Sequence, residues 1–369
     1  MIDNKRLVER FMKYVKIDSE TGNEKEFYNN LIKELEDLGI EVITDKAGEK
    51  TNSNANNIYC FIKGNNKNEA SRIFSSHMDT VKPGKNIEPV EENGYIKSKG
   101  DTILGADDKA GVAVIMEAVH TIKEKNLKHN NIEIVFTISE EGGLNGSKNF
   151  DFNILKSKYA YIIDSGSKVG TIINQAPAQY KIDFEITGKS SHAGAAPEKG
   201  ISAINVSAEA ISKMNLLRID EETTANVGSF HADGETNIVN SKAIFKTEAR
   251  SLYDDKLENQ VNHMIDTVNE VANKYKAGVK IDKRYLYKAY KIDEDEDIIK
   301  DVEKIMNDLD IKVFKTSSGG GSDANIFNDN NIKAVNLGVG VDGAHTLNEN
   351  LNLDDFKKLS EIILKLMIE

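Results

Sequence analysis

The chain has 369 residues, of which 39% are hydrophobic and 29% charged, and its formal net charge is −12. This is the composition of a soluble globular protein longer than one usual domain, and no apolar run approaches the ~20 residues that cross a membrane. The acidic balance, without a basic stripe, excludes nucleic acid as the expected partner. A single cysteine, Cys60, and a polar N-terminus without an apolar signal core predict a cytoplasmic protein.

Helical and strand patterns alternate in the first part of the chain. Apolar residues at helical spacing predict a helix over residues 7–15 and a second helix that Thr21 and Glu24 would open as a capping box. A final amphipathic helix is predicted over residues 356–366. Short apolar runs predict buried strands at 72–76, 132–138, 159–163 and 334–338. We therefore expect a three-layer α/β/α domain made of residues 1–176 and 290–369.

A different unit is predicted between residues 177 and 289. Its patterns follow the order β-α-β-β-α-β, which is the ferredoxin-like arrangement. We therefore expect an inserted α+β domain. The predicted elements are a strand at 182–186, a helix at 201–214, strands at 223–230 and 237–248, a helix at 257–268 and a strand at 279–286.

Each predicted strand of the sheet domain leads to a side chain that can bind a metal. In open α/β sheets, sites form at the carboxyl ends of the strands, so we expect these side chains to converge in one crevice. In chain order they are His77, the pair Glu140 and Glu141, Asp164 and His345.

Two short motifs bear on the chemistry of this crevice. His77 and Asp79 point the same way in an extended segment, so Asp79 can orient the imidazole for metal binding, although a histidine satisfied in a turn is the alternative. Asp107 and Asp108 precede an apolar helical pattern. They are either helix caps, or one of them bridges two cations through both carboxylate oxygens.

The neighbours Glu140 and Glu141 face opposite ways in extended geometry. One can therefore bind metal while the other, with a pKa raised by nearby carboxylates, exchanges a proton with water and a leaving amine. An exposed acidic turn is the alternative. Two histidines and several carboxylates without a cysteine suit zinc, or less often cobalt or manganese, and paired metals suit amide hydrolysis.

Seven segments spread over nearly the whole chain resemble the M20 family of metallopeptidases, most closely its tripeptidase T branch. They are residues 76–81 (SHMDTV), 104–111 (LGADDKAG), 139–142 (SEEG), 163–164 (ID), 188–194 (GKSSHAG), 322–325 (SDAN) and 343–346 (GAHT). The resemblance implies a zinc-peptidase domain with a ferredoxin-like lid inserted at 177–289.

The resemblance also implies two zinc ions per subunit, with cobalt or manganese as alternatives. Asp107 would bridge them, with a cis peptide bond to Asp108. Glu140 would be the general base and Asp79 would support a ligand histidine. The remaining ligands would be His77 and Asp164 on one metal, and Glu141 and His345 on the other.

Three residues of the lid carry expectations from the same resemblance. His192 would reach the active site of a partner subunit and stabilise the oxyanion, which implies a homodimer through the lid. Asn237 and Arg250 would bind the backbone and the carboxylate of the substrate.

The substrate expectation follows from Asp164, because relatives with aspartate here tend to be aminopeptidases or dipeptidases. We therefore predict release of the N-terminal residue from short peptides, above all tripeptides. The first alternative is a deacylase or carboxypeptidase acting on N-acyl amino acids or dipeptides. The second is a non-catalytic metal-binding protein on the same scaffold.

Overall fold

The computed structural model describes residues 1–66 and 71–369, which form two compact units. The first unit contains Met1–Gln175, Lys291–Ser317 and Ser322–Glu369. The second contains Ala176–Tyr290 together with the short loop Ser318–Gly321. In both described ranges, no helix is long and apolar enough to cross a membrane.

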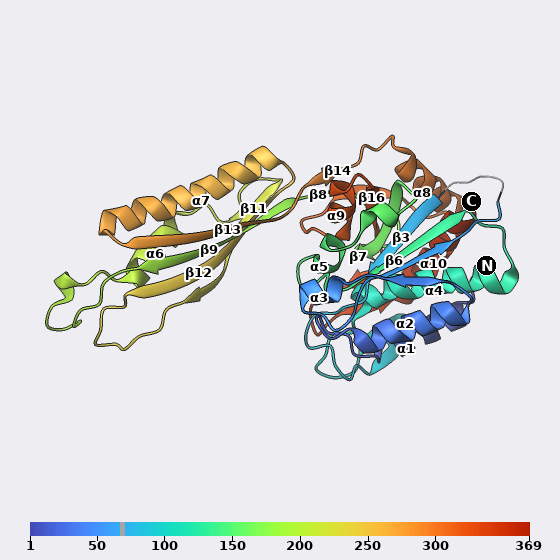
Figure 1. Ribbon diagram of the computed structural model, residues 1–369, viewed down its shortest axis with the longest axis horizontal. Helices are drawn as coiled ribbons and strands as arrows, with labels where there is room; N and C mark the ends of the chain where they lie inside the picture. The colour runs from blue at the N-terminus through green and yellow to red at the C-terminus, as the bar shows by residue number, and fades with distance from the viewer. Residues whose placement is uncertain (67–70) are drawn as a thin grey trace. The chain divides into compact units, whose positions relative to one another are not determined.

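The described part of the first unit is built on a nine-stranded sheet (Figure 1). Its strands are β1 (Val42–Thr44), β2 (Ile58–Ile62), β3 (Ser71–His77), β6 (Asn131–Thr137), β7 (Tyr159–Ser165), β8 (Thr171–Ala176), β14 (Tyr290–Lys291), β15 (Phe314–Ser317) and β16 (Lys333–Gly338). The order is β1-β2-β6-β3-β7-β16-β8-β14, and β15 pairs with β8 off this path. β3 is parallel to both β6 and β7, and β16 is parallel to β7. The carboxyl ends of these four central strands therefore lie at one edge of the sheet.

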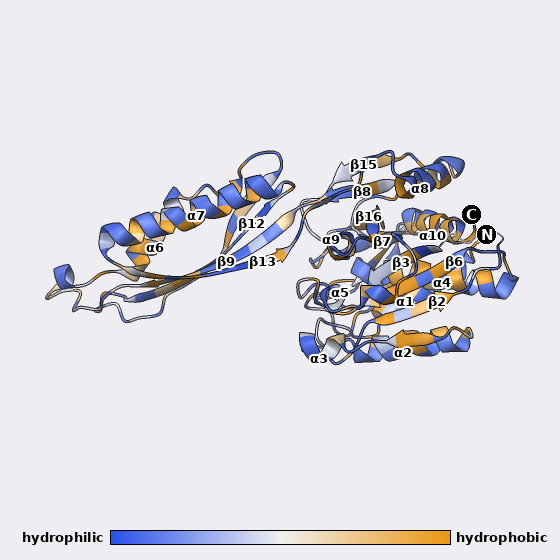
Figure 2. Cartoon of the chain, turned by 45° about the horizontal axis from the view of Figure 1, so that its top comes forward, coloured by the Kyte–Doolittle hydropathy of each residue, from blue (hydrophilic) through white to orange (hydrophobic). Residues whose placement is uncertain are grey.

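Helices cover both faces of this sheet. The helices are α1 (Asn4–Val15), α2 (Lys25–Asp37), α3 (Ala47–Thr51), α4 (Ala106–Lys125), α5 (Asn145–Lys148), α8 (Asp297–Asp308), α9 (Asp323–Asp329) and α10 (Leu353–Ile368), with a 3₁₀ turn at Phe152–Ile154. α4 and α9 both contact β7, and residues 160–163 of β7, which alternate between the two faces, are all buried. α4 packs further against α1 and α10, and α9 against α5. Figure 2 shows the hydrophobic residues of β6 and α4 in the interior. The predicted three-layer α/β fold is confirmed.

A smaller four-stranded sheet joins a segment of the first half of the chain to one near its end. Its strands are β4 (Pro89–Glu92), β5 (Tyr95–Ser98), β17 (Val341–Asp342) and β18 (Asn350–Asn352), in the order β17-β18-β5-β4. β17 and β18 are antiparallel partners, so residues 343–349 form the loop of a hairpin. This loop carries His345.

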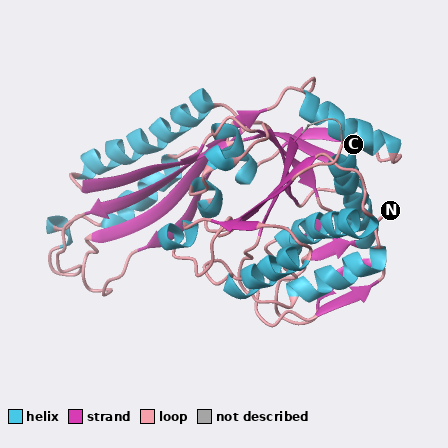
Figure 3. Ribbon diagram, turned by 45° about the vertical axis from the view of Figure 1, so that its right-hand side comes forward, coloured by secondary structure: helices cyan, strands magenta, loops and turns pink. Residues whose placement is uncertain are grey.

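The second unit is an antiparallel sheet with two helices on one face (Figures 1 and 3). Its elements are β9 (Ala178–Thr187), a 3₁₀ turn at Pro197–Lys199, α6 (Ala203–Lys213), β10 (Leu217–Arg218), β11 (Thr223–His231), β12 (Lys242–Ser251), α7 (Asp254–Tyr275) and β13 (Gly278–Tyr287). The strand order β10-β11-β12-β9-β13 is the ferredoxin-like order with one short strand added. Alternation along β9 explains the single helical layer, because Ile182, Phe184 and Ile186 are buried in the core with the helices while the residues between them are not.

Two local predictions are wrong. Glu24 makes no side-chain cap at the start of α2, because its carboxylate accepts hydrogen bonds from Ser53 and Ser139 instead. The strand predicted to begin at residue 237 begins at Lys242. The backbone carbonyl of Asn237 accepts a hydrogen bond from the amide of Ala193, so this segment pairs with a neighbouring loop and not with the sheet.

Glu117→Ala should strongly destabilise the first unit. Glu117 on α4 is fully buried and accepts hydrogen bonds from Arg6, from Nε to both carboxylate oxygens at 2.9 and 3.1 Å and from Nη2 to Oε1 at 2.7 Å. Removing the carboxylate leaves the Arg6 side chain, which is 22% exposed, paired with Glu124, and the loss of hydrogen bonds to a charged group costs about 1.5–3 kcal/mol. The free energy of unfolding in urea measures the loss. Glu124→Ala is the matched control, because Glu124 also pairs with Arg6 but is 49% exposed, and its loss should cost about 0–1 kcal/mol. Equal losses in the two variants would contradict the prediction.

Candidate metal centre

The sheet of the first unit places most of the candidate ligands at one edge. His77 is the last residue of β3, and Asp164 lies near the end of β7. Glu140 and Glu141 follow β6, and Asp107 lies in the first turn of α4. These positions follow from the parallel pairing of the central strands, whose carboxyl ends open on the same crevice.

Asp107 lies between the two histidines of the centre. Its Oδ1 is 3.0 Å from Nε2 of His77, and its Oδ2 is 3.3 Å from Nε2 of His345. His77 Nε2 is also 3.6 Å from Asp164 Oδ1, and His345 Nε2 is 2.6 Å from Glu141 Oε1. The two oxygens of one carboxylate thus face two separate groups of ligands.

The backbone at this point is unusual in a way that the family resemblance implied. The peptide bond between Asp107 and Asp108 is cis, and both residues have non-helical dihedral angles inside α4. Asp108 is turned into the protein, where its carboxylate accepts hydrogen bonds from the hydroxyl of Ser76 and the amide of Gly111. Asp107 is therefore the aspartate of the pair that faces the crevice.

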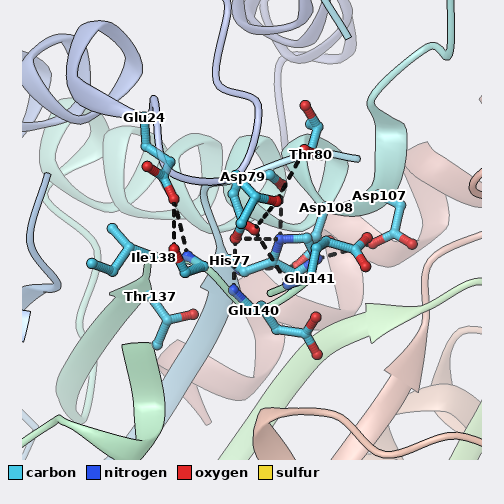
Figure 4. A network of polar contacts seen from close by, with 12 residues as sticks. Glu24, His77, Asp79, Thr80, Asp107, Asp108, Thr137, Ile138, Glu140 and Glu141 are labelled. Atoms are coloured by element: carbon cyan, nitrogen blue, oxygen red, sulfur yellow. Dashed lines mark hydrogen bonds and ion pairs between the residues drawn. The ribbon is translucent and has the colours of Figure 1, made fainter. Parts of the chain in front are cut away.

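Asp79 organises the centre from behind (Figure 4). Its Oδ1 accepts a hydrogen bond from the backbone amide of Glu140 at 2.9 Å. Its Oδ2 accepts hydrogen bonds from the amide of Glu141 at 3.2 Å and from the hydroxyl of Thr21 at 2.8 Å. Nδ1 of His77 lies 2.9 Å from the backbone carbonyl of Asp79 and 3.4 Å from its carboxylate. The backbone carbonyl is thus the closer acceptor for the Nδ1 proton, which leaves Nε2 free to bind a metal. The carboxylate of Asp79 mainly holds the two glutamates.

Ser139 sets the direction of the two glutamates. It adopts a left-handed backbone conformation with φ of 48°, which is rare for a residue with a side chain. The carboxylate of Glu24 holds it there by accepting both its amide, at 3.1 Å, and its hydroxyl, at 3.2 Å. In Figure 4 the carboxylate of Glu140 points away from Asp79. The carboxylate of Glu141, by contrast, contacts the imidazole of His345.

The close spacing of several carboxylates shifts the pKa values of the residues in the centre. Burial and then the nearby charge of Asp164 raise the pKa of Glu140 well above its ordinary value. Hydrogen bonds to Asp107 and Glu141 raise the pKa of His345 to about 10. Burial opposes protonation of His77, but the carboxylates of Asp107, Asp164 and Asp79 around its ring raise its pKa well above its ordinary value. A bound cation would relieve this repulsion.

The donor set fits divalent metal ions. Within the described residues, ligand atoms of three groups lie within 4.8 Å of one another: His77, Asp107 and Asp164; Asp107, Glu141 and His345; and His77, Glu140 and Glu141. The first two groups share Asp107. Imidazole nitrogens with carboxylate oxygens and no thiolate are the ligands of catalytic zinc and related metals.

The remaining predicted residues lie in the second unit. His192 is exposed, and its Nδ1 accepts the amides of Gly194 and Ala195 at 3.1 Å, so its proton is on Nε2. Asn237 is exposed in the neighbouring loop. Arg250 on β12 is half-buried and pairs with Glu248 at 3.0 Å.

Several residues of the centre were not identified from sequence. The spacing of Thr21 and Glu24 predicts a helix cap, but in the structure Thr21 bonds to Asp79 and Glu24 to Ser139, next to the candidate ligands. Asp323 is buried and accepts hydrogen bonds from Thr137 and Ser147 beside the end of β6. Glu349 follows His345 by four residues, and this short spacing was the signal that could have identified it.

The stability of the metal-free protein should depend on pH through the titration of Asp164. Burial raises the pKa of Asp164 from its ordinary value of 3.8 to about 7. Between these values the folded state keeps a proton that the unfolded chain has lost, so stability decreases as pH rises through this interval. Asp164→Asn lacks this equilibrium. In the presence of a chelator, the Tm of the variant minus that of the wild type should therefore increase from about pH 4 to about pH 8. A constant difference would contradict the prediction.

The fold and the centre together define a class of protein, a hydrolase on an α/β scaffold whose clustered histidines and carboxylates could hold metal ions. A family model described as "Peptidase family M20/M25/M40" matches residues 73–369. The chain belongs to this family and is a peptide hydrolase.

Full-length relatives agree with this assignment. An aminopeptidase PepT from Bacillus cereus ATCC 10987 has a solved structure that is 41% identical, with a TM-score of 0.91 and coverage of 99% of this chain and 98% of that one. A tripeptidase structure from Staphylococcus aureus is 38% identical, with a TM-score of 0.95 and coverage of 100% and 98%. The protein YqjE of Bacillus subtilis, described as uncharacterized, is 42% identical over 369 residues, which are 100% of this chain and 99% of that protein.

Proposed function

We propose that the protein is a two-metal aminopeptidase that releases the N-terminal residue from short peptides, tripeptides in particular. The observation that carries this proposal is the position of Asp107, whose Oδ1 faces His77 and whose Oδ2 faces His345. A carboxylate in this position is suited to bridge two cations. The names of the two solved relatives, an aminopeptidase and a tripeptidase, support the substrate class.

The proposed ligands divide into two sites that share Asp107. His77 and Asp164 complete one site, and Glu141 and His345 complete the other. Zinc is the metal that we propose for both, with cobalt or manganese as alternatives. When bound, such a metal pair polarises a carbonyl group and makes hydroxide available near neutral pH.

Glu140 is the proposed general base. Its buried carboxylate at the crevice suits a group that accepts a proton from the attacking water and later delivers it to the leaving amine. Asp79 positions it through the hydrogen bond from the Glu140 amide. His192, with its proton on Nε2, is the proposed donor to the oxyanion in the site of a partner subunit, which requires a homodimer through the second unit. Asn237 and Arg250 are proposed to bind the substrate backbone and carboxylate.

A peptide panel tests this function. Metal-free protein is assayed before and after addition of zinc, cobalt or manganese, with tripeptides, dipeptides and their N-acetylated forms. We expect metal-dependent release of the N-terminal residue that is lost on acetylation. Cleavage of the acetylated compounds alone would establish a deacylase, and metal binding without any hydrolysis would establish a non-catalytic protein. A cytoplasmic location is proposed as well, and cell fractionation tests it.

A further inference from the structure

A single buried carboxylate binds the backbone just before and inside the first turn of α4. Oε2 of Glu349 accepts the amides of Leu104 and Gly105, both at 2.8 Å, and Oε1 accepts the amide of Asp107 at 3.0 Å. Glu349 is only 2% exposed, and Leu104 and Gly105 are buried as well. Because Leu104 and Gly105 are buried away from water, Glu349 is the group that satisfies their amides.

Glu349 also lies at the base of the loop that carries His345. This loop joins β17 and β18, and β18 is held on its other side by β5. His345 has a left-handed φ of 65°, and its side chain is 52% exposed, so packing around the imidazole does little to fix it. Its position depends instead on the local loop, where Thr346 donates both its amide and its hydroxyl to the carbonyl of Gly343.

The two segments meet at the metal centre. The Oδ2 of Asp107 is 3.3 Å from Nε2 of His345, although the two residues belong to segments far apart in the chain. Glu349 spans the same two segments, with its backbone in the His345 loop and its carboxylate on the Asp107 amide. A shift of either segment would change the separation of the two ligands.

We infer that Glu349 is a positioning residue of the metal centre, which sets the distance between Asp107 and His345 by anchoring one ligand segment to the other. This inference rests on the proposed metal centre. The geometry needs a carboxylate, because three amide donors converge on its two oxygens. A glutamine has one acceptor oxygen, and its NH₂ group would face an amide donor. Loss of a group that orients a metal ligand typically weakens metal binding by about 10–100-fold.

The test compares Glu349→Gln with Glu133→Gln. Glu133 is an equally buried carboxylate that also accepts several hydrogen bonds, from Tyr59, Ser71, Lys156 and Ser157. It therefore reports what loss of a buried carboxylate does to stability alone. Zn²⁺ binding is measured by titration calorimetry, and the visible spectrum of the Co²⁺-loaded protein reports ligand geometry.

We expect Glu349→Gln to weaken at least one Zn²⁺ binding constant by about 10–100-fold and to change the Co²⁺ spectrum, while Glu133→Gln changes neither. Weakening below about tenfold, or equal weakening in both variants, would overturn the inference. If Glu349→Gln does not fold, Glu349→Asp, which keeps the charge but withdraws the carboxylate, is judged by the same criteria. Because metal binding is measured apart from hydrolysis, wild-type protein that binds Zn²⁺ but cleaves no peptide would contradict the proposed function and leave this test intact.

Discussion

Glu140→Gln should lower kcat for tripeptide hydrolysis by about 10²–10⁴-fold, which is the usual contribution of a general base. The substitution keeps the size of the side chain and the backbone amide that Asp79 holds at 2.9 Å. It removes only the ability to accept and return a proton. KM should change little, because the proposed substrate contacts lie elsewhere. Steady-state kinetics with added zinc measures the effect.

A metal titration of the same variant separates the proposed base from a metal ligand. The ligand atoms of Glu140, His77 and Glu141 lie within 4.8 Å of one another, so these residues could share a metal ion. A role as metal ligand is therefore the competing explanation for any loss of activity. As a base, Glu140 can be replaced without a change in zinc stoichiometry or affinity. A fall in zinc affinity that matches the fall in kcat would show that Glu140 binds the metal instead.

Asp107→Ala should abolish the two-metal centre. In the proposed centre the carboxylate gives one oxygen to each group of ligands, so its removal should affect both metals at once. Loss of a residue that merely orients a ligand weakens metal binding by about 10–100-fold, and loss of a shared ligand should cost at least about a hundredfold. We expect zinc stoichiometry to fall and peptide hydrolysis to disappear at micromolar zinc. Calorimetry and metal analysis of the dialysed protein measure the first effect.

Asp354→Ala is the matched control for this variant. Asp354 is an exposed aspartate in the first turn of α10, so its loss removes a similar charge near a helix start without touching the centre. Its zinc stoichiometry should equal that of the wild type. An Asp107→Ala protein that still binds two zinc ions with wild-type affinity would show that the bridge lies elsewhere.

Much of the first unit was determined by local pattern. The apolar-rich runs at 72–76, 132–138, 159–163 and 334–338 became β3, β6, β7 and β16, because strands covered on both faces are rich in apolar residues. The positions of His77 and Asp164 followed, since a polar residue at the end of such a strand opens on the crevice. The β-α-β-β-α-β order of the second unit was equally visible in the pattern.

Only the tertiary structure decided how the ligands are oriented. Glu349 and Leu104 are 245 positions apart, and the Glu24 carboxylate meets Ser139 across 115 positions, so no local pattern could join them. Nδ1 of His77 lies closer to the backbone carbonyl of Asp79 than to its carboxylate, and this difference depends on the geometry of the turn. The sequence by itself therefore determined that His77, Asp164 and the pair Glu140 and Glu141 reach the crevice, because strand period and strand ends are local properties. The folded chain decided which atoms face one another, because the buried carboxylates that orient the ligand segments bind partners from distant parts of the chain.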